Sequence, residues 1–377
     1  MAAGGGFVVS GTDGITYADA GVDIHAGDKA VELMKDAVAR THGPEVLGGV
    51  GAFAGLFDAS ALLGYERPLL ATSTDGVGTK IVIAQAMGIH DTIGRDLVAM
   101  VVDDIVVCGA KPLVMTDYIA CGQVVPERIA DIVRGIAEGC IEAGVALVGG
   151  ETAEHPGLMG VDEYDVAGAA MGLVEASKVL GPERVESGDV VIAMASSGLH
   201  SNGYSLVRAV VAQQGWTLET YVPELTRSLG AELLEPTRIY AKLCVSLAES
   251  TPGLHAFSHV TGGGLAANLA RVLPKGLAAT VSRDSWALPP IFSLIQDAGK
   301  VPWADLEQTL NLGIGMVAVV APAEVAAVVE ACGAAGVPAW VIGEVAPDAG
   351  RPTSPDVVRG AKGVDGGAVL LTGGYRA

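Results

Sequence analysis

Apolar strand-like segments alternate with amphipathic helical segments along this chain, and a polar interruption divides them into two series. The interruption, at 176–188, contains a Gly-Pro pair between two apolar regions. The patterns before it predict strands at 68–74, 112–120, 145–150 and 165–174 and helices at 28–41, 92–108 and 126–143. The patterns after it predict strands at 189–195, 254–259, 277–282, 314–321 and 338–345 and helices at 202–213, 264–272, 289–298 and 323–335.

Two such series predict an α/β or α+β protein with two domains. A length of 377 residues is also typical of a protein with two domains. We expect a flexible leader at 1–16, an N-terminal domain at 17–175, a C-terminal domain at 176–350 and an irregular tail at 351–377.

Composition narrows the functional classes. Half of the residues are hydrophobic, which excludes global disorder, and 23 Lys+Arg against 43 Asp+Glu give a net charge of -20. So acidic a chain is a poor candidate for binding nucleic acid or an anionic membrane, although a local pocket can still bind phosphate.

The apolar stretch from Leu312 is interrupted by Pro322 and Glu324, and no Lys or Arg precedes the apolar N-terminal residues. We therefore expect no membrane span, no signal peptide and a cytoplasmic protein. The five cysteines form no C-x-x-C pair, which favours buried free thiols in a reducing compartment. A catalytic thiol is the alternative.

The string S-T-D-G-V-G-T-K at 73–80 follows a predicted strand. Gly76 and Gly78 would let backbone N–H groups face an anion, Lys80 adds positive charge, and Asp75 suits Mg²⁺. An ordinary strand-to-helix turn with an Asp cap explains the string equally well.

The predicted helix 92–108 carries Asp96, Asp103 and Asp104 among apolar residues. Seven residues separate Asp96 from Asp103, so the two lie near one face about 10.5 Å apart along the axis. Buried carboxylates need a metal, a base or a ligand, and the alternative is a solvated face. Because of that separation, Asp96 and Asp104 should not share one Mg²⁺, which predicts more than one ion.

Three further strings place polar groups beside glycines. The first, G-G-E-T-A-E-H-P-G at 149–157, puts Glu151 in a loop after a strand, where ligands commonly bind, although surface acids in a turn are the alternative. The second, S-S-G-L-H-S-N-G-Y at 196–204, precedes a helix and contains His200, which could act as a general acid or base or donate a hydrogen bond to phosphate. A helix N-cap accounts for only one of its polar residues. The third, H-V-T-G-G-G at 259–264, has the glycines of an anion site at a helix start.

Together these strings closely resemble the phosphoribosylformylglycinamidine cyclo-ligase family, the aminoimidazole ribonucleotide synthetases of purine biosynthesis. Further shared strings are D-A-G-V-D-I at 19–24, D-L-V-A-M at 96–100, Y-D-V-A-G at 164–168 and P-T-R-I-Y at 236–240. The resemblance covers about 15–345, in order and at fitting spacing.

The resemblance implies ATP, Mg²⁺ and formylglycinamidine ribonucleotide as ligands, and aminoimidazole ribonucleotide, ADP and phosphate as products. It also implies a homodimer, in which we expect ferredoxin-like N-terminal sheets to pair around a central β-structure. No nucleic acid or membrane partner is expected.

By the same resemblance, the residues divide into four groups. We expect ATP contacts from Lys35, Gly48, Gly49, Gly51, Asp75, Gly76, Gly78, Thr79 and Lys80. We expect metal contacts from Asp75, Asp96 and Asp104 and catalytic roles for His200, His259 and Asp104. Substrate contacts are expected from Glu151, Ser197, Ser201, Asn202, Thr261, Gly262 and Gly263. The family often has Asn where this chain has Asp103, so no role is assigned to Asp103.

Two alternatives stay open. The first is a related enzyme: a selenophosphate synthetase, a thiamine-monophosphate kinase or the glutamine-dependent ligase that acts one step earlier in the same pathway. Each of these would have the same ATP-binding half and a different substrate-binding half. A selenophosphate synthetase usually needs a reactive Cys or selenocysteine near the N-terminus, and here no Cys precedes Cys108. A catalytically inactive ATP-binding module is the other alternative, and the acids at 75, 96 and 104 argue against it.

Overall fold

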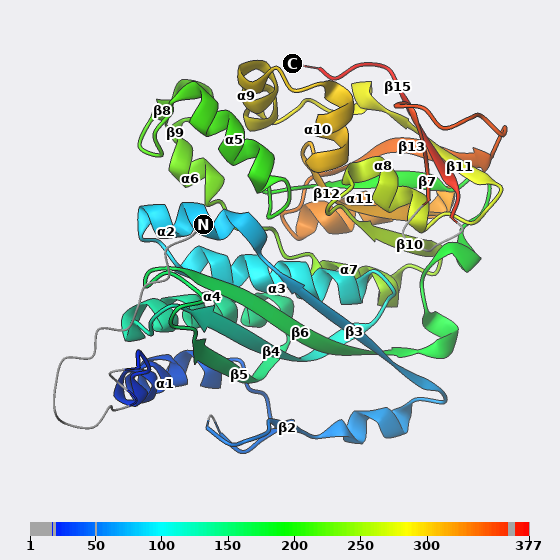
Figure 1. Ribbon diagram of the computed structural model, residues 1–377. Coiled ribbons are helices and arrows are strands. Elements are labelled where there is room, and N and C mark those ends of the chain that lie inside the picture. The colour runs from blue at the N-terminus through cyan, green and yellow to red at the C-terminus, as the bar shows by residue number, and fades with distance from the viewer. Residues whose placement is uncertain (1–16, 18–19, 50, 361–365, 377) are drawn as a thin grey trace, which may run out of the picture.

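The computed structural model describes residues 17, 20–49, 51–360 and 366–376, and the expected leader at 1–16 lies outside them. The chain forms a four-stranded and a seven-stranded sheet, and helices lie between and around them (Figure 1). Along 57–175 the predicted elements are confirmed to within a few residues, and the mixed α/β class is confirmed. None of the helices in the described ranges is long and apolar enough to span a bilayer.

The four-stranded sheet has the order β3-β6-β4-β5. Its strands are β3 (Pro68–Gly76), β4 (Lys111–Cys121), β5 (Ala146–Glu154) and β6 (Tyr164–Glu175). Strands β4 and β5 are parallel, and β6 runs antiparallel to both β3 and β4. The chain order is strand, helices, strand, helix, strand, strand, whereas a ferredoxin-like unit is β-α-β-β-α-β. The expected ferredoxin-like topology is therefore wrong.

Helices α3 (Asp91–Val106) and α4 (Pro126–Ala143) pack together, and α3 lies along β3 and β6. Helix α4 begins with Pro126 in its first turn and ends at Gly144, whose left-handed conformation stops the helix. Helix α1 (Ile24–Ala39) packs against α4, and the hairpin of β1 (Val46–Leu47) with β2 (Leu56–Phe57) follows it.

The seven-stranded sheet has the order β10-β12-β7-β13-β11-β15-β14. Its strands are β7 (Val190–Ala195), β10 (Leu254–His259), β11 (Leu277–Ser282), β12 (Ile314–Val320), β13 (Ala339–Pro347), β14 (Val357–Arg359) and β15 (Ala368–Thr372). The expectation of an irregular tail is wrong here, because β15 pairs in parallel with β11 and β14 pairs with β15. These two strands are short, and their Gly-rich flanks resemble a loop in sequence.

The remaining helices surround this sheet or join the halves. They are α2 (Ile81–Met87), α5 (Tyr204–Gln214), α6 (Leu229–Leu233), α7 (Ala241–Ser250), α8 (Gly264–Arg271), α9 (Pro290–Gly299), α10 (Trp303–Thr309) and α11 (Val325–Ala334). The short strands β8 (Tyr221–Val222) and β9 (Arg227–Ser228) form a separate hairpin. Helix α7 was not predicted, although Ala241, Cys244 and Leu247 are buried at helical spacing. All five cysteines are unpaired, and only Cys108 is not fully buried.

One face of the four-stranded sheet is covered by α3 and α4, and the opposite face is open in the part of the chain that the structure describes. The strand register places Leu70, Met171 and Tyr118 on the open face, where they are 55%, 37% and 41% exposed. Five neighbours on this face are also exposed and uncharged: Thr72, Thr74, Thr116, Ala167 and Ala169. The exposed charges of this face are Glu151, which pairs with Tyr118, and Asp165, which pairs with Ala120. Such a flat, weakly polar surface is typical of an interaction face.

Candidate active site between the two sheets

Three of the four aspartates of α3 bond to residues of the C-terminal half. Asp96 accepts hydrogen bonds from the backbone N–H and the hydroxyl of Thr237, both at 2.7 Å. Asp103 accepts from the backbone N–H of Tyr240 at 3.1 Å. The Oδ1 atom of Asp104 lies 2.9 Å from Nδ1 of His259. Helix α3 of the N-terminal half thus holds two polar segments of the C-terminal half, 237–240 and 259–264, in place beside it.

A cavity of about 320 Å³ opens beside the Asp104–His259 pair. Residues of β3, α3, β10 and α8 line it. The polar ones are Thr72, Ser73, Asp104, Ser258, His259, Thr261, Asn268 and Arg271. Arg271 donates to the Asn268 side chain at 3.2 Å. The sequence patterns did not indicate Asn268 or Arg271, because both lie inside a helix and outside any polar string.

His259, which lines this cavity, and Asp75, which does not line it but lies near enough to feel the charges of Asp104 and His259, have shifted pKa values. Desolvation raises the pKa of Asp75, a hydrogen bond from the Gly76 N–H opposes this, and the negative charge of Asp104 raises it further. For His259, burial would lower the pKa, but the hydrogen bond to Asp104 and the charges of Asp103, Asp104 and Asp75 outweigh burial and raise it. The Nε2 atom of His259 is buried and has no hydrogen-bond partner in the described residues.

His200 is buried in a tight turn and has a left-handed φ of 61°. Its Nε2 accepts from the backbone N–H of Ser197 at 3.2 Å, so the neutral ring carries its proton on Nδ1, which has no partner within the described chain. Burial, and then the nearby charges of His259 and Lys80, lower the pKa of His200 well below its ordinary value. The two histidines therefore differ in protonation tendency, which often separates acid and base roles.

The sequence predicts that Lys80 contacts phosphate and that Asp96 contacts metal, whereas the structure joins these two side chains. Both are fully buried, and Lys80 Nζ lies 2.8 Å from Asp96 Oδ1. Lys80 also donates to the backbone carbonyls of His200 at 3.1 Å and Glu235 at 2.6 Å. In this arrangement neither charge is open to a ligand, so the pair connects the two halves.

The polar turn at 196–204 and the glycine turn at 261–264 face each other. A Cβ at Gly262 would lie 3.4 Å from Oδ1 of Asn202, which shows how closely the turns approach. Ser201 bonds to Thr237 at 2.9 Å and Ser197 donates to the Pro236 carbonyl at 2.6 Å, so both hydroxyls already have partners. Gly263 and Gly264 have left-handed φ values, which glycine adopts without strain.

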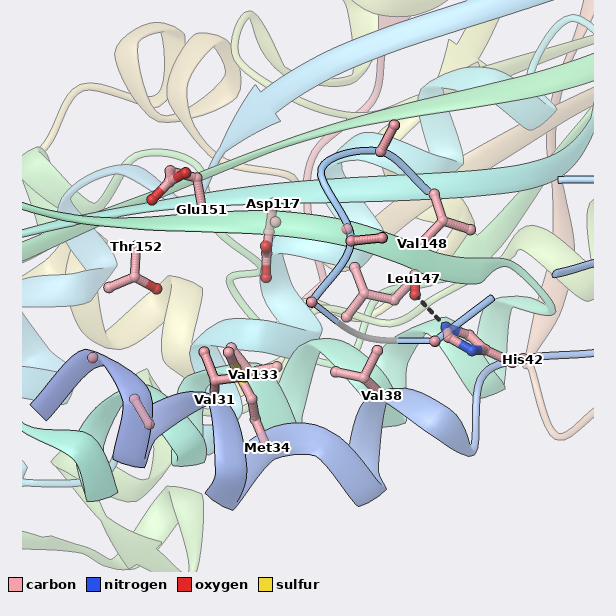
Figure 2. Close-up of a pocket in the computed structure, with 18 of the residues that line it drawn as sticks. Val31, Met34, Val38, His42, Asp117, Val133, Leu147, Val148, Glu151 and Thr152 are labelled. Atoms are coloured by element: carbon pink, nitrogen blue, oxygen red, sulfur yellow. Dashed lines mark hydrogen bonds between the residues drawn. The ribbon is translucent and has the colours of Figure 1, made fainter. Parts of the chain in front are cut away.

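A second cavity, of about 290 Å³, lies between α1 and the four-stranded sheet (Figure 2). Its walls include Val31, Met34 and Val38 of α1, and Gly49 and Gly51 lie at its edge. Exposed Lys35 and Gly48 are not among its lining residues. Gly76, at the end of β3, and Gly78 and Thr79, in the turn that follows, lie outside both cavities.

Glu151 lies inside β5, because this strand continues to Glu154, and not in the predicted loop. It also lines the second cavity. Asp117, which the sequence patterns did not indicate, points from β4 into the same cavity (Figure 2). The sequence feature that could have identified Asp117 is its position between Met115 and Ile119, on the buried face of a strand.

Within the described ranges, no group of three or more His, Cys, Asp or Glu side chains is placed to hold a metal ion. Mg²⁺ usually takes one or two carboxylates and completes its shell with phosphate and water. Asp75 and Asp104 fit that requirement, because both residues are exposed and the charge of Asp104 reaches Asp75, whose pKa it raises. Asp96 does not fit it in this conformation.

Comparison with known proteins decides the family. A phosphoribosylformylglycinamidine cyclo-ligase of Geobacillus kaustophilus is 51% identical over 335 residues, which cover 89% of this chain and 96% of the relative. The chain belongs to the phosphoribosylformylglycinamidine cyclo-ligase family. The cyclo-ligase of Desulfitobacterium hafniense is 50% identical over 332 residues, 88% of this chain and 97% of that protein.

Two domain families also match this cyclo-ligase family member. Residues 57–174 match the N-terminal domain of AIR synthase related protein, and residues 186–352 match its C-terminal domain. Among solved structures, a thiamine-monophosphate kinase from Stenotrophomonas maltophilia has a TM-score of 0.65 at 21% identity, over 91% of this chain and 97% of that one. The hydrogenase maturation protein HypE in complex with ATP has a TM-score of 0.58 at 17% identity, over 92% and 94%. At these identities the two structures support the fold alone.

Proposed function

We propose that this protein is an ATP-dependent cyclo-ligase that converts formylglycinamidine ribonucleotide to aminoimidazole ribonucleotide, with ADP and phosphate released. The observation that carries this proposal is the polar cavity between the halves, which the bonded pair Asp104 and His259 lines and beside which Asp75 lies, in a chain 51% identical to a cyclo-ligase. We assign 17–175 to ATP binding and dimerisation and 176–350 to substrate binding.

The chemistry requires an amide oxygen to become a good leaving group. Phosphoryl transfer from ATP to that oxygen achieves this, and the amidine nitrogen of the same molecule then attacks the carbon and closes the imidazole ring. Phosphate leaves with the former amide oxygen. Catalysis of such a sequence depends mainly on charge neutralisation and on holding the internal nucleophile close.

The two histidines suit different parts of this sequence. His259 is oriented by Asp104 through Nδ1, which leaves Nε2 to accept the proton that the amidine nitrogen loses on ring closure. His200 presents an N–H at Nδ1 and suits donation to the oxygen that departs. Glu151, Ser197, Ser201, Asn202 and the glycine turn with Thr261, Gly262 and Gly263 are assigned to the substrate.

For ATP and metal, we assign Asp75 and Asp104 to Mg²⁺. Asp104 uses Oδ1 for His259, so Oδ2 is available to a cation. Bound there, Mg²⁺ would neutralise phosphate charge during transfer. Lys35, Gly48, Gly49, Gly51 and the turn Gly76–Thr79 are assigned to ATP, because glycine-rich turns present backbone N–H groups to phosphate.

We further propose a cytoplasmic homodimer that buries the open sheet face. Leu70, Tyr118 and Met171 are exposed there and no charged side chain separates them. Packing two such faces would remove apolar surface from water and form a central β-structure. Met171→Asp should give a monomeric mass at micromolar concentration, and a monomeric wild-type mass would refute the dimer.

The function is tested by following ADP and the imidazole product together in one assay. Wild type should form both in equal amounts, and ADP without ring product would favour a kinase of the same fold. His200→Ala should lower kcat and kcat/KM together while ATP binding survives, because the side chain serves the transition state. His25→Ala, at an exposed position of α1, is the control. Loss of ATP binding with normal turnover at saturation would refute the role of His200.

A further inference from the structure

The structure holds a carboxylate with an unpaired oxygen atom in the cavity beneath α1. Asp117 lies on the helix-covered face of β4, between the buried side chains of Met115 and Ile119. Its Oδ2 atom is buried and has no hydrogen-bond partner in the described part of the chain. Burying a carboxylate oxygen without a donor is costly, so such an atom is usually completed by a ligand.

The space around this carboxylate is kept free by glycine. Asp117 pairs with Gly150 across the sheet, and a Cβ at Gly150 would lie 1.7 Å from Oδ1 of Asp117. Gly168, the partner of Asp117 on its other side, also lacks a side chain. The strand neighbours thus give Asp117 room that any larger residue would occupy.

The walls of the cavity are apolar on the side that faces Asp117. Val31 and Met34 of α1 and Val133 of α4 lie opposite its carboxylate (Figure 2). Leu147 and Val38 continue this surface toward His42, whose Nε2 bonds to the Leu147 carbonyl at 2.7 Å. An apolar slot with one hydrogen-bond acceptor fits a planar heterocycle that carries an N–H donor.

We propose that this cavity binds the adenine base of ATP and that Asp117 accepts a hydrogen bond from its 6-amino group. The inference rests on the proposed function and identifies Asp117 as the base-reading residue, the one that recognises the adenine of ATP. Gly49 and Gly51 border the same cavity, so a base inside would leave its phosphates near glycine backbone N–H groups. A purine with a 6-oxo group would instead set an oxygen lone pair against the carboxylate oxygen.

The test compares nucleotides that differ only at position 6 of the purine. With wild type, kcat/KM for ATP should exceed that for ITP and for purine riboside triphosphate by about 10²-fold, because a site built to bond a donor rejects analogues that lack it. Asp117→Asn should reduce the ATP-to-ITP ratio at least tenfold, since its amide N–H can donate to the 6-oxo group. Asp131→Asn, on the outer surface of α4, is the control and should keep the wild-type ratio.

Binding of ADP and IDP, measured by calorimetry without turnover, should show the same change in ratio. An unchanged ratio in Asp117→Asn would overturn the base-reading role while the cyclo-ligase activity with ATP stands. Equal use of ATP, ITP and purine riboside triphosphate by wild type would also overturn it, even if the variant does not fold. Failure of wild type to form the imidazole product with any nucleotide would refute the proposed function instead.

Discussion

Lys80 Nζ lies 2.8 Å from the carboxylate of Asp96, and neither side chain has any exposed surface. The pair joins the turn after β3 to α3, and through Thr237 and the His200 carbonyl it also contacts the C-terminal half. A buried pair of this kind costs desolvation energy, but its partners compensate each other. Its position makes it a connection between the two halves of the site.

Removing one member of this pair should destabilise the protein strongly. Asp96→Asn leaves the buried Lys80 charge uncompensated, so we expect a loss of about 3–5 kcal/mol in the free energy of unfolding. Urea denaturation followed by circular dichroism measures it. Lys80→Met combined with Asp96→Leu should lose less than Asp96→Asn alone. Lys29→Met, which breaks an exposed pair with Glu127, should cost under about 1 kcal/mol.

The three aspartates that the sequence assigns to metal binding should differ in how much their substitution raises the Mg²⁺ concentration that the enzyme requires. Asp75→Asn and Asp104→Asn should each raise the Mg²⁺ concentration for half-maximal rate by about tenfold or more, and by different amounts. Asp96→Asn should leave it near the wild-type value, because its carboxylate already binds Lys80 and Thr237. Titrating activity with Mg²⁺ at saturating ATP measures this, with Asp131→Asn as control. A rise in Asp96→Asn equal to that in Asp75→Asn would restore Asp96 as a metal ligand.

The glycine turn should tolerate no side chain at Gly264. This residue has a φ of +70°, and an added Cβ would lie 1.7 Å from the Glu307 carbonyl oxygen. Gly264→Ala should therefore lower the melting temperature and raise the KM for the ribonucleotide. Gly276→Ala is the matched control, because its φ is +91° but nothing lies within 4 Å of its Cβ. Equal effects of both substitutions would show that φ strain alone matters.

Stability should depend on pH through Asp117. Burial raises the pKa of Asp117 from 3.8 to about 7, so the folded state binds this proton more tightly than the unfolded state. The resulting stability is fully present below the unfolded pKa and is lost as pH rises through the folded pKa. Between about pH 4 and 7, the free energy of unfolding of wild type should fall relative to Asp117→Asn by at most about 1.4 kcal/mol per pH unit. Parallel pH profiles for the two proteins would contradict the shift.

Local patterns were sufficient for most of the elements. Helix α4 was predicted to its observed ends, 126–143, because a proline and a glycine mark them. Strand β10 at 254–259 was likewise predicted to its ends. The same reading missed α7, although its buried residues have helical spacing. It also missed the C-terminal strands β14 and β15, since such short strands carry little periodic signal and gain stability from their neighbours.

For the site, the polar strings indicated most of the residues that meet at the cleft but not their partners. Asp104, His259 and His200 came from separate strings, and the structure brings Asp104 to His259 within 2.9 Å. Lys80 and Asp96 were predicted to contact ligands, and the structure pairs them with each other. Two charged residues 16 positions apart give no sequence signal of their contact, because only the packing of α3 against the turn after β3 creates it.

The sequence by itself determined the two α/β halves, the polar turns and the resemblance to a cyclo-ligase, because strand and helix periodicity and glycine turns are local properties of the chain. Only the tertiary structure decided the order of the strands, the pairing of Lys80 with Asp96, and the isolation of Asp117 beneath α1. Burial sets the energy of a charge, and burial depends on segments that lie far apart in the sequence.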